Sequence, residues 1–215
     1  MIQRNGHRDS TRQSDIALVL FDFDHVLAHY DHGLRIASLA DATGATAARV
    51  AAVLSESGHK REYESGPIDT DTSLGPLGAG LGAAVDRATW VAARVAGSVA
   101  DEGVLALVVD IAQRMPIGVL TNNGALLADA ARTIVAPLYP ALEGRVLCSG
   151  ALAVRKPDPR IFRLAVAHFG VEAGQVLFVD DVFQNVQAAR TAGLHAEQVT
   201  NAATLTRALQ AHGLR

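Results

Sequence analysis

Short apolar segments, each of strand length, recur along the chain and are separated by longer polar or mixed stretches. These segments are too short for helices and mostly lack polar alternation, which is typical of strands buried on both faces of a sheet. Four are clear and a fifth is weaker: residues 16–23 (IALVLFDF), 117–121 (IGVLT), 145–149 (RVLCS), 176–181 (VLFVDD) and, less apolar, 195–200 (HAEQVT).

Helical patterns fill the spaces between the later strands. One runs from Ile161 to His168, and Gly170 is expected to end it as a left-handed capping residue. A second begins after Asp181, with small and apolar residues at Val182, Val186, Ala189 and Gly193. The alternation of strand and helix predicts an α/β fold with a parallel sheet, right-handed crossovers and helices on both faces.

Residues 32–100 do not share this alternation. They contain at least two helical stretches around a middle rich in Gly, Pro and Asp, which predicts an all-helical insertion after the first strand. The Gly-rich segment 75–82 reads as a turn region, because no Gly-Lys-Ser/Thr follows that would make it a phosphate loop. The predicted organisation is a flexible tail (1–14), a core domain (15–31 and 101–215) and the helical insertion (32–100).

Composition narrows the choice of partners. The 215 residues carry a formal net charge of −3 and 19% charged residues, so there is no basic field for nucleic-acid binding, and small-molecule chemistry is expected. Cys148 is the single cysteine and lies in a predicted buried strand, which excludes an internal disulfide and fits a reducing compartment. With no apolar run near the ~18 residues of a membrane span and no signal-peptide core, a soluble cytoplasmic protein is expected.

Polar side chains follow the predicted strands where these end. The first strand ends in Asp22 and Asp24, and the fourth ends in Asp180 and Asp181. The second is followed by Thr121, Asn122 and Asn123, and Lys156 lies in a loop before a helix. Since the carboxyl ends of parallel strands meet at one edge of a sheet, these groups are expected to share one cleft.

The acidic cluster needs a compensating cation, because close carboxylates repel each other and lose solvation when buried. Hard oxygen ligands with few nitrogen or sulfur donors suit Mg²⁺. Residues i and i+2 of an extended segment point to one side with Cα atoms about 6.6 Å apart, which leaves room for a phosphoryl group. Asp22 is therefore a candidate nucleophile and Asp24 a candidate general acid and base, with Lys156 and Thr121 holding the phosphoryl oxygens.

Four segments in this order resemble the motifs of the haloacid dehalogenase-like (HAD) hydrolases: DFDHVL, LTNN, RKPDPRIF and FVDDVFQNVQAARTAG. The resemblance spans residues 16–200 and points to the phosphatase-type branch with a small helical cap. It implies a Rossmann-like core, a cap formed by the insertion, and Mg²⁺-dependent hydrolysis of a small phosphomonoester through an aspartyl-phosphate on Asp22.

The resemblance also implies a ligand set. The metal would be held by the Asp22 carboxylate, the Asp24 backbone carbonyl and Asp181, with Asp180 as a direct or water-linked ligand. Which of Asp180 and Asp181 binds directly stays open. Phosphate would contact Thr121, the backbone near Asn122, and Lys156. His25 stands where the family usually has Gly: it either tolerates a positive φ there, points at the substrate, or is a partly exposed residue near the cap hinge.

Three alternatives remain at this stage. A 2-haloacid dehalogenase is disfavoured by the resemblance, because that branch lacks an acidic residue two positions after the nucleophile and works without Mg²⁺, whereas Asp24 is present here. A phosphomutase differs only in how the cap controls water. The third is a non-catalytic HAD-like binding module. The sequence identifies neither the substrate nor the oligomeric state.

Overall fold

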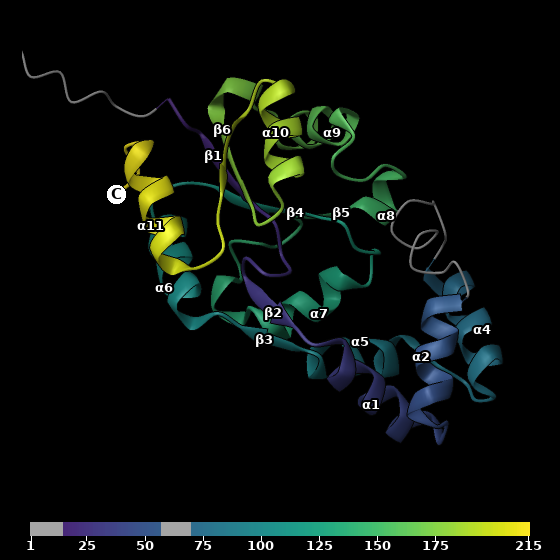
Figure 1. Cartoon of the computed structure of the whole chain (residues 1–215). Coiled ribbons are helices and arrows are strands. Elements are labelled where there is room, and N and C mark those ends of the chain that lie inside the picture. The colour runs from purple at the N-terminus through teal and green to yellow at the C-terminus, as the bar shows by residue number, and fades with distance from the viewer. Residues whose placement is uncertain (1–14, 57–69) are drawn as a thin grey trace, which may run out of the picture.

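The computed structural model describes residues 15–56 and 70–215, so the predicted tail (1–14) lies outside the described residues. Its centre is a five-stranded parallel sheet of order β5-β4-β1-β6-β7 (Figure 1). The strands are β1 (Leu18–Phe21), β4 (Ile117–Thr121), β5 (Val146–Cys148), β6 (Val176–Asp180) and β7 (His195–Gln198). All five lie within the predicted apolar segments, and the predicted α/β fold with a Rossmann-like parallel sheet is confirmed.

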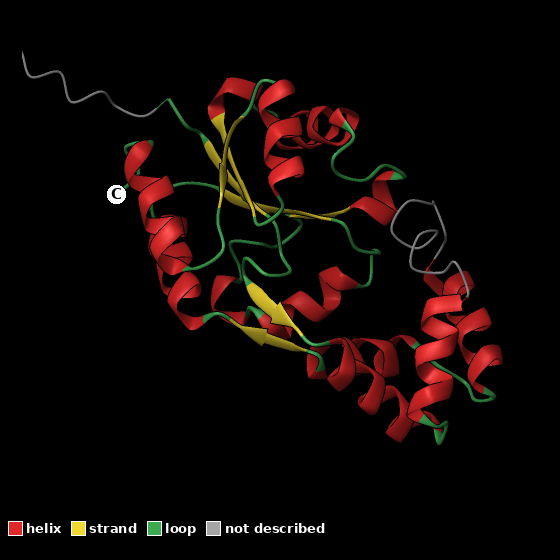
Figure 2. Ribbon diagram, in the orientation of Figure 1, coloured by secondary structure: helices red, strands yellow, loops and turns green. Residues whose placement is uncertain are grey.

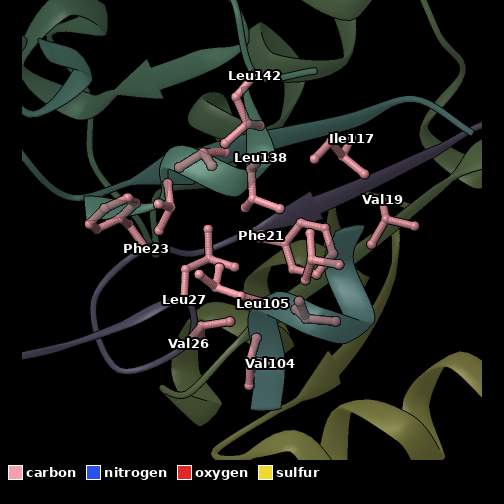
Figure 3. Close-up of a cluster of buried hydrophobic side chains, with 14 of the residues drawn as sticks. Val19, Phe21, Phe23, Val26, Leu27, Val104, Leu105, Ile117, Leu138 and Leu142 are labelled. Carbon is pink, nitrogen blue, oxygen red and sulfur yellow. The ribbon is translucent and has the colours of Figure 1, made fainter. Parts of the chain in front are cut away.

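Alternate residues of the strands face opposite layers of helices. Val19 and Phe21 pack in one cluster with α6 (Glu102–Ala112), α7 (Leu127–Ile134) and α11 (Ala202–Ala211) (Figure 3). Leu18 and Leu20 pack in the other cluster, which includes residues of two further helices. These helices are α9 (Pro159–Phe169) and α10 (Phe183–Thr191). The sheet is thus buried on both faces, as its continuous apolar strands predict.

Short connecting elements complete the core. The predicted end of α9 is confirmed, because Gly170 follows it in the left-handed region with φ 66°. Cys148 is buried at the end of β5, as expected for a small core residue, and burial raises the pKa of its thiol to about 12. The remaining short helices are η1 (Ala136–Leu138), α8 (Ser149–Leu152) and η2 (Ala173–Gln175).

Within the described residues, four helices after β2 form a bundle with its own apolar cluster (Figure 2). They are α1 (His32–Thr43), α2 (Ala47–Glu56), α4 (Thr70–Leu81) and α5 (Arg87–Ala96). Trp90 is buried in this cluster and packs between the helices rather than facing solvent.

The expectation of a turn region at residues 75–82 is wrong, because most of that segment belongs to α4. Leu74, Leu77 and Leu81 recur at helical spacing and are buried in the cluster of the bundle. A Cβ on Gly80 would lie 2.8 Å from a methyl group of Val53, so glycine allows α4 to approach α2 closely. Gly80 thus serves packing between α4 and α2, and burial of the leucines outweighs the low helix propensity of the glycines.

The insertion is also not helical throughout. Ser98–Ala100 form β3, which pairs antiparallel with β2 (Ala28–Tyr30). This two-stranded ribbon lies between the helical bundle and the sheet (Figure 2). The backbone of the chain therefore leaves the core and returns to it through two hydrogen-bonded strands, a pairing too short and too distant in sequence for apolar periodicity to reveal.

Among residues 15–56 and 70–215, no helix combines the length and the apolar character needed to span a membrane.

Candidate active site

The candidate site lies at the carboxyl ends of three neighbouring strands. The chain passes from β1 to β4 and β5 on one side of the sheet and then crosses to β6 and β7 on the other side of β1, and ligands bind at such a switch point. β1 lies between β4 and β6, so Asp22, Thr121 and Asp180 end adjacent strands. The backbone N–H of Asp22 donates to the carbonyl oxygen of Val179 at 2.9 Å, which continues the ladder to the edge of the site. Residues far apart in the sequence are in this way brought to one edge of the sheet.

Lys156 contacts the carboxylates that lie at the ends of β1 and β6. Its ammonium nitrogen lies 3.0 Å from Oδ1 of Asp22 and 2.6 Å from Oδ2 of Asp180. The lysine side chain is fully buried, and burial alone would lower its pKa, but the two carboxylates outweigh that effect and raise it. Lys156 therefore stays charged and neutralises part of the acidic cluster.

Asn122 fixes the loop that carries Lys156. Its side-chain Nδ2 donates to the backbone carbonyl of Lys156 at 3.0 Å, and its Oδ1 accepts from the backbone N–H of the same residue at 2.9 Å. This pair of hydrogen bonds holds the end of β4 against the lysine loop. The amide side chain of Asn122 thus acts on the backbone of Lys156.

Asp180 is completely buried, and both of its carboxylate oxygens accept hydrogen bonds from protein donors. Oδ1 accepts from the backbone N–H of Val182 at 2.8 Å, and Nδ2 of Asn185 lies 3.0 Å from each oxygen. Together with the contact from Lys156, these donors occupy most of the accepting capacity of the carboxylate. Asp181 is only half-buried and has more of its carboxylate free for a ligand.

Asp24 is held by residues from two other elements. Its Oδ1 accepts from the guanidinium of Arg94 on α5, and its Oδ2 accepts from Nδ2 of Asn123 at 3.0 Å. The same nitrogen of Asn123 lies 2.9 Å from Oγ1 of Thr121, a side chain that is itself buried. Asn123 therefore connects the Asp24 carboxylate to the hydroxyl at the end of β4.

His25 occupies the turn after Asp24 with φ 63°, in the left-handed region. Its backbone N–H donates to the carbonyl of Ala28 at 2.8 Å, and its side chain is exposed. The turn therefore needs the backbone conformation that glycine adopts most easily.

Carboxylate oxygens of Asp22, Asp180 and Asp181 lie within 4.8 Å of one another. Burial raises the pKa of Asp22 to about 7, against the opposing effect of Lys156 and with a further upward contribution from Asp180. The pKa of Asp181 is also raised, first by burial and then by the Asp180 carboxylate. A group of crowded carboxylates whose negative charges repel one another is chemically suited to a hard divalent cation.

Two residues at this site were not predicted from the sequence. Asn185 lies in the first turn of α10, and Arg94 lies in the last turn of α5. A signal for Arg94 exists in the sequence, because it is four residues after Trp90 and so lies on the buried side of an amphipathic helix. A charged residue on an apolar helix face indicates a buried partner.

Comparison with known proteins agrees with this geometry. The sequence model of the haloacid dehalogenase-like hydrolases matches residues 16–193. The chain belongs to this family. Asp22, Thr121 and Asp180, which belong to the matched motifs, lie at the ends of β1, β4 and β6, as the strand pattern predicts.

Individual relatives come from different branches. A phosphatase of Mycobacterium tuberculosis, MT3486, is 35% identical over 82 residues, which are 38% of this chain and 37% of that relative's length. A HAD family enzyme of Bacteroides thetaiotaomicron, solved with magnesium and inorganic phosphate, has a TM-score of 0.67 and 18% identity, covering 85% of this chain and 93% of its own. An L-2-haloacid dehalogenase of Xanthobacter autotrophicus has a TM-score of 0.58 and 19% identity, covering 86% and 77%. At these identities the solved structures show a shared fold.

Proposed function

We propose that this HAD-like hydrolase is a Mg²⁺-dependent phosphatase that acts on a small phosphomonoester. The observation that carries the proposal is the contact of Lys156 with Asp22 and Asp180, beside a second aspartate held two residues after Asp22. An ammonium group between a candidate nucleophile and an acidic cluster suits a dianionic phosphoryl group. The named phosphatase among the relatives supports the same reaction class.

Asp22 is the proposed nucleophile. One of its carboxylate oxygens attacks phosphorus, the bond from phosphorus to the ester oxygen breaks, and Asp24 gives its proton to that oxygen. In the second step Asp24 takes a proton from water, the water oxygen bonds to phosphorus, and the bond to Asp22 breaks to release inorganic phosphate. The Thr121 hydroxyl, the backbone near Asn122 and the Lys156 ammonium are the proposed contacts of the phosphoryl oxygens.

Asp22, the backbone carbonyl of Asp24, and Asp181 are the proposed Mg²⁺ ligands. Asp180 is assigned an orienting role, because its oxygens already accept from Lys156, Asn185 and the Val182 N–H. Once bound, Mg²⁺ supplies positive charge to the oxygens of the phosphoryl group. The crowded carboxylates and the raised pKa of Asp22 fit such an ion.

We assign the cap role to the helical segment within residues 32–100, with 15–31 and 101–215 as the core. The support is the position of α5. Arg94 on this helix contacts Asp24 in the site, and Arg87 on the same helix forms an ion pair with Asp129 of the core. In that pair the Arg87 Nε donates to Asp129 on α7 at 2.8 Å. A segment seated in this way excludes bulk water from the phosphoryl group. His25, exposed at the same entrance, is a proposed substrate contact.

The test is a screen of phosphate esters with and without Mg²⁺, run beside fluoroacetate and chloroacetate. We expect Mg²⁺-dependent release of inorganic phosphate by the wild type and none by Asp22→Asn. Halide release without metal would instead assign the chain to the dehalogenase branch. Transfer of the phosphoryl group to a second hydroxyl of the substrate, with no free phosphate, would identify a mutase.

A further inference from the structure

Arg94 is an unusual residue for the place it occupies. It lies on α5 among the helices of the insertion, yet its side chain is almost fully buried. Its guanidinium lies 4.2 Å from the ring centroid of Tyr30 and 6.0 Å from that of Phe23. It donates to Asp24 through one terminal nitrogen, while its Nε has no hydrogen-bond partner among the described residues.

Stability does not account for a charged residue at this position. Moving a guanidinium out of water costs several kcal/mol, and its attraction to one carboxylate only partly offsets that cost. Replacing such a pair by apolar residues of similar volume is often neutral or stabilising. The neighbours of Arg94 on α5, Trp90 and Ala93, are apolar and buried, so an apolar side chain would suit this face of the helix. The cost indicates that the pair serves the site.

The backbone around Arg94 is held rigidly. Its carbonyl accepts from the Ser98 hydroxyl at 2.8 Å, and the Gly97 carbonyl accepts from the backbone N–H of Asp31 at 2.8 Å. A Cβ on Gly97 would lie 2.9 Å from both the Asp31 carbonyl oxygen and the Arg35 Cβ, so the end of α5 and the start of α1 are in close contact. The guanidinium therefore extends from a fixed joint at the base of the insertion.

The two oxygens of Asp24 are held from opposite sides. Arg94 approaches Oδ1 from the insertion, and Asn123 approaches Oδ2 from the end of β4. The Asp24 side chain is partly exposed, so without these contacts it would have freedom to turn toward solvent. Two donors that meet one carboxylate from different elements define a single orientation.

We propose that Arg94 is a positioning residue that fixes the Asp24 carboxylate for proton transfer to and from the substrate oxygen. The inference rests on the proposed phosphatase reaction, in which Asp24 protonates the leaving oxygen. It makes the acid and base of the core dependent on a residue of the helical insertion. Packing of the helical insertion against the core then also orients the Asp24 carboxylate.

The readout is the dependence of rate on the leaving group. An alkyl phosphate needs a proton on its leaving oxygen, whereas 4-nitrophenyl phosphate releases a stable anion and needs little help. General acid catalysis contributes about 10²–10⁴-fold. We expect Arg94→Met to lower kcat for an alkyl phosphate about 100-fold and kcat for 4-nitrophenyl phosphate less than about 10-fold. Arg94→Lys, which keeps the charge but not the planar fork, should restore part of the lost alkyl phosphate activity.

Arg35→Met is the matched control. Arg35 also stacks on an aromatic ring, 4.8 Å from the Trp90 centroid, and its terminal nitrogen donates to the Tyr30 hydroxyl at 3.3 Å, but it is not a donor to Asp24. Its loss should affect both substrates equally. Equal losses for both substrates in Arg94→Met would overturn the proposal, as would multiplicative effects of Arg94→Met and Asp24→Asn on alkyl phosphate hydrolysis. We expect the double variant to be no slower than Asp24→Asn.

Thermal unfolding separates this proposal from the proposed function. Asp24→Asn should lower Tm by several degrees in the Arg94 background and by clearly less in the Arg94→Met background. Equal Tm shifts in the two backgrounds would show that Asp24 and Arg94 do not interact, and this result would overturn the proposal whatever the activity. If the shifts differ but wild type hydrolyses no phosphate ester, the pair is real, the proposed function fails, and the role in proton transfer falls with it.

Discussion

The buried carboxylate of Asp22 should make the stability of the metal-free protein depend on pH, and Asp22→Asn should remove that dependence. Burial raises the pKa of Asp22 from 3.8 to about 7 in the folded chain. Unfolding restores the lower value, so between these two pKa values the folded state binds more protons than the unfolded state. The contribution of Asp22 to stability is therefore complete below about pH 4 and is lost as the pH rises through about 7.

The size of the effect follows from the shift. Each pKa unit corresponds to about 1.4 kcal/mol, so a shift of roughly three units changes the free energy of unfolding by about 4 kcal/mol. Exposure of Asp22 is only 8%, so water screens little of this effect. Because asparagine does not titrate, the difference between wild type and Asp22→Asn should change by about 4 kcal/mol between about pH 4 and about pH 8. The variant should be the more stable form at the higher pH.

The assay is urea unfolding in the presence of EDTA at a series of pH values. Far-UV circular dichroism follows the whole chain, and the fluorescence of Trp90 follows the helical bundle, so disagreement between the two probes would reveal separate transitions. Asp41→Asn, which removes an exposed carboxylate on α1, is the control. Parallel pH profiles for wild type and Asp22→Asn would refute the reasoning, because burial would then not oppose the charge of Asp22.

Three further perturbations test other contacts of the site. Lys156→Met removes the cation between two buried carboxylates and should cost about 3–5 kcal/mol of unfolding free energy near neutral pH, measured by urea unfolding; a loss below 1 kcal/mol would contradict the ion pairing. Asn185→Ala removes the amide that orients Asp180 and should weaken Mg²⁺ binding about 10–100-fold in calorimetric titration, whereas unchanged affinity would deny the orienting role. His25→Gly should leave Tm unchanged or raised and His25→Val should cost about 1–2 kcal/mol, since φ is positive there; equal stabilities would argue against strain in this turn.

The sheet could be predicted from the sequence because its strands are short, apolar and followed by polar residues. The segment 117–121 matches β4 residue for residue, and the other four strands of the parallel sheet lie within the predicted segments. The same reasoning placed Asp22, Asp180 and Lys156 at one edge, since the ends of parallel strands converge. Local pattern and topology were sufficient for these groups, and in the structure the Lys156 ammonium lies 3.0 Å from Asp22 and 2.6 Å from Asp180.

The parts that were missed depend on contacts between distant segments. Arg94 is 70 positions from Asp24, and no periodicity in α5 identifies its partner. The role of Asn185 follows from its hydrogen bonds to both oxygens of the buried Asp180, and these contacts are visible only in the folded structure. Segment 75–82 contains glycines and a proline that predict a turn, but burial of its leucines against α2 stabilises a helix. In segment 75–82 tertiary packing thus outweighs local propensity, whereas Arg94 and Asn185 were missed because their partners lie on other elements.

The pairing of β2 with β3 has a consequence for how this chain can change. Residues 28–30 and 98–100 are hydrogen-bonded neighbours, so the two points where the helical segment attaches are adjacent in space. The entropy of closing a longer or shorter segment between two adjacent points varies only with the logarithm of its length. Helices in this position can accordingly be exchanged, extended or shortened while the strand ends that carry the carboxylates, and the loop that carries Lys156, keep their spacing. New substrate preference is therefore accessible without rebuilding the chemistry.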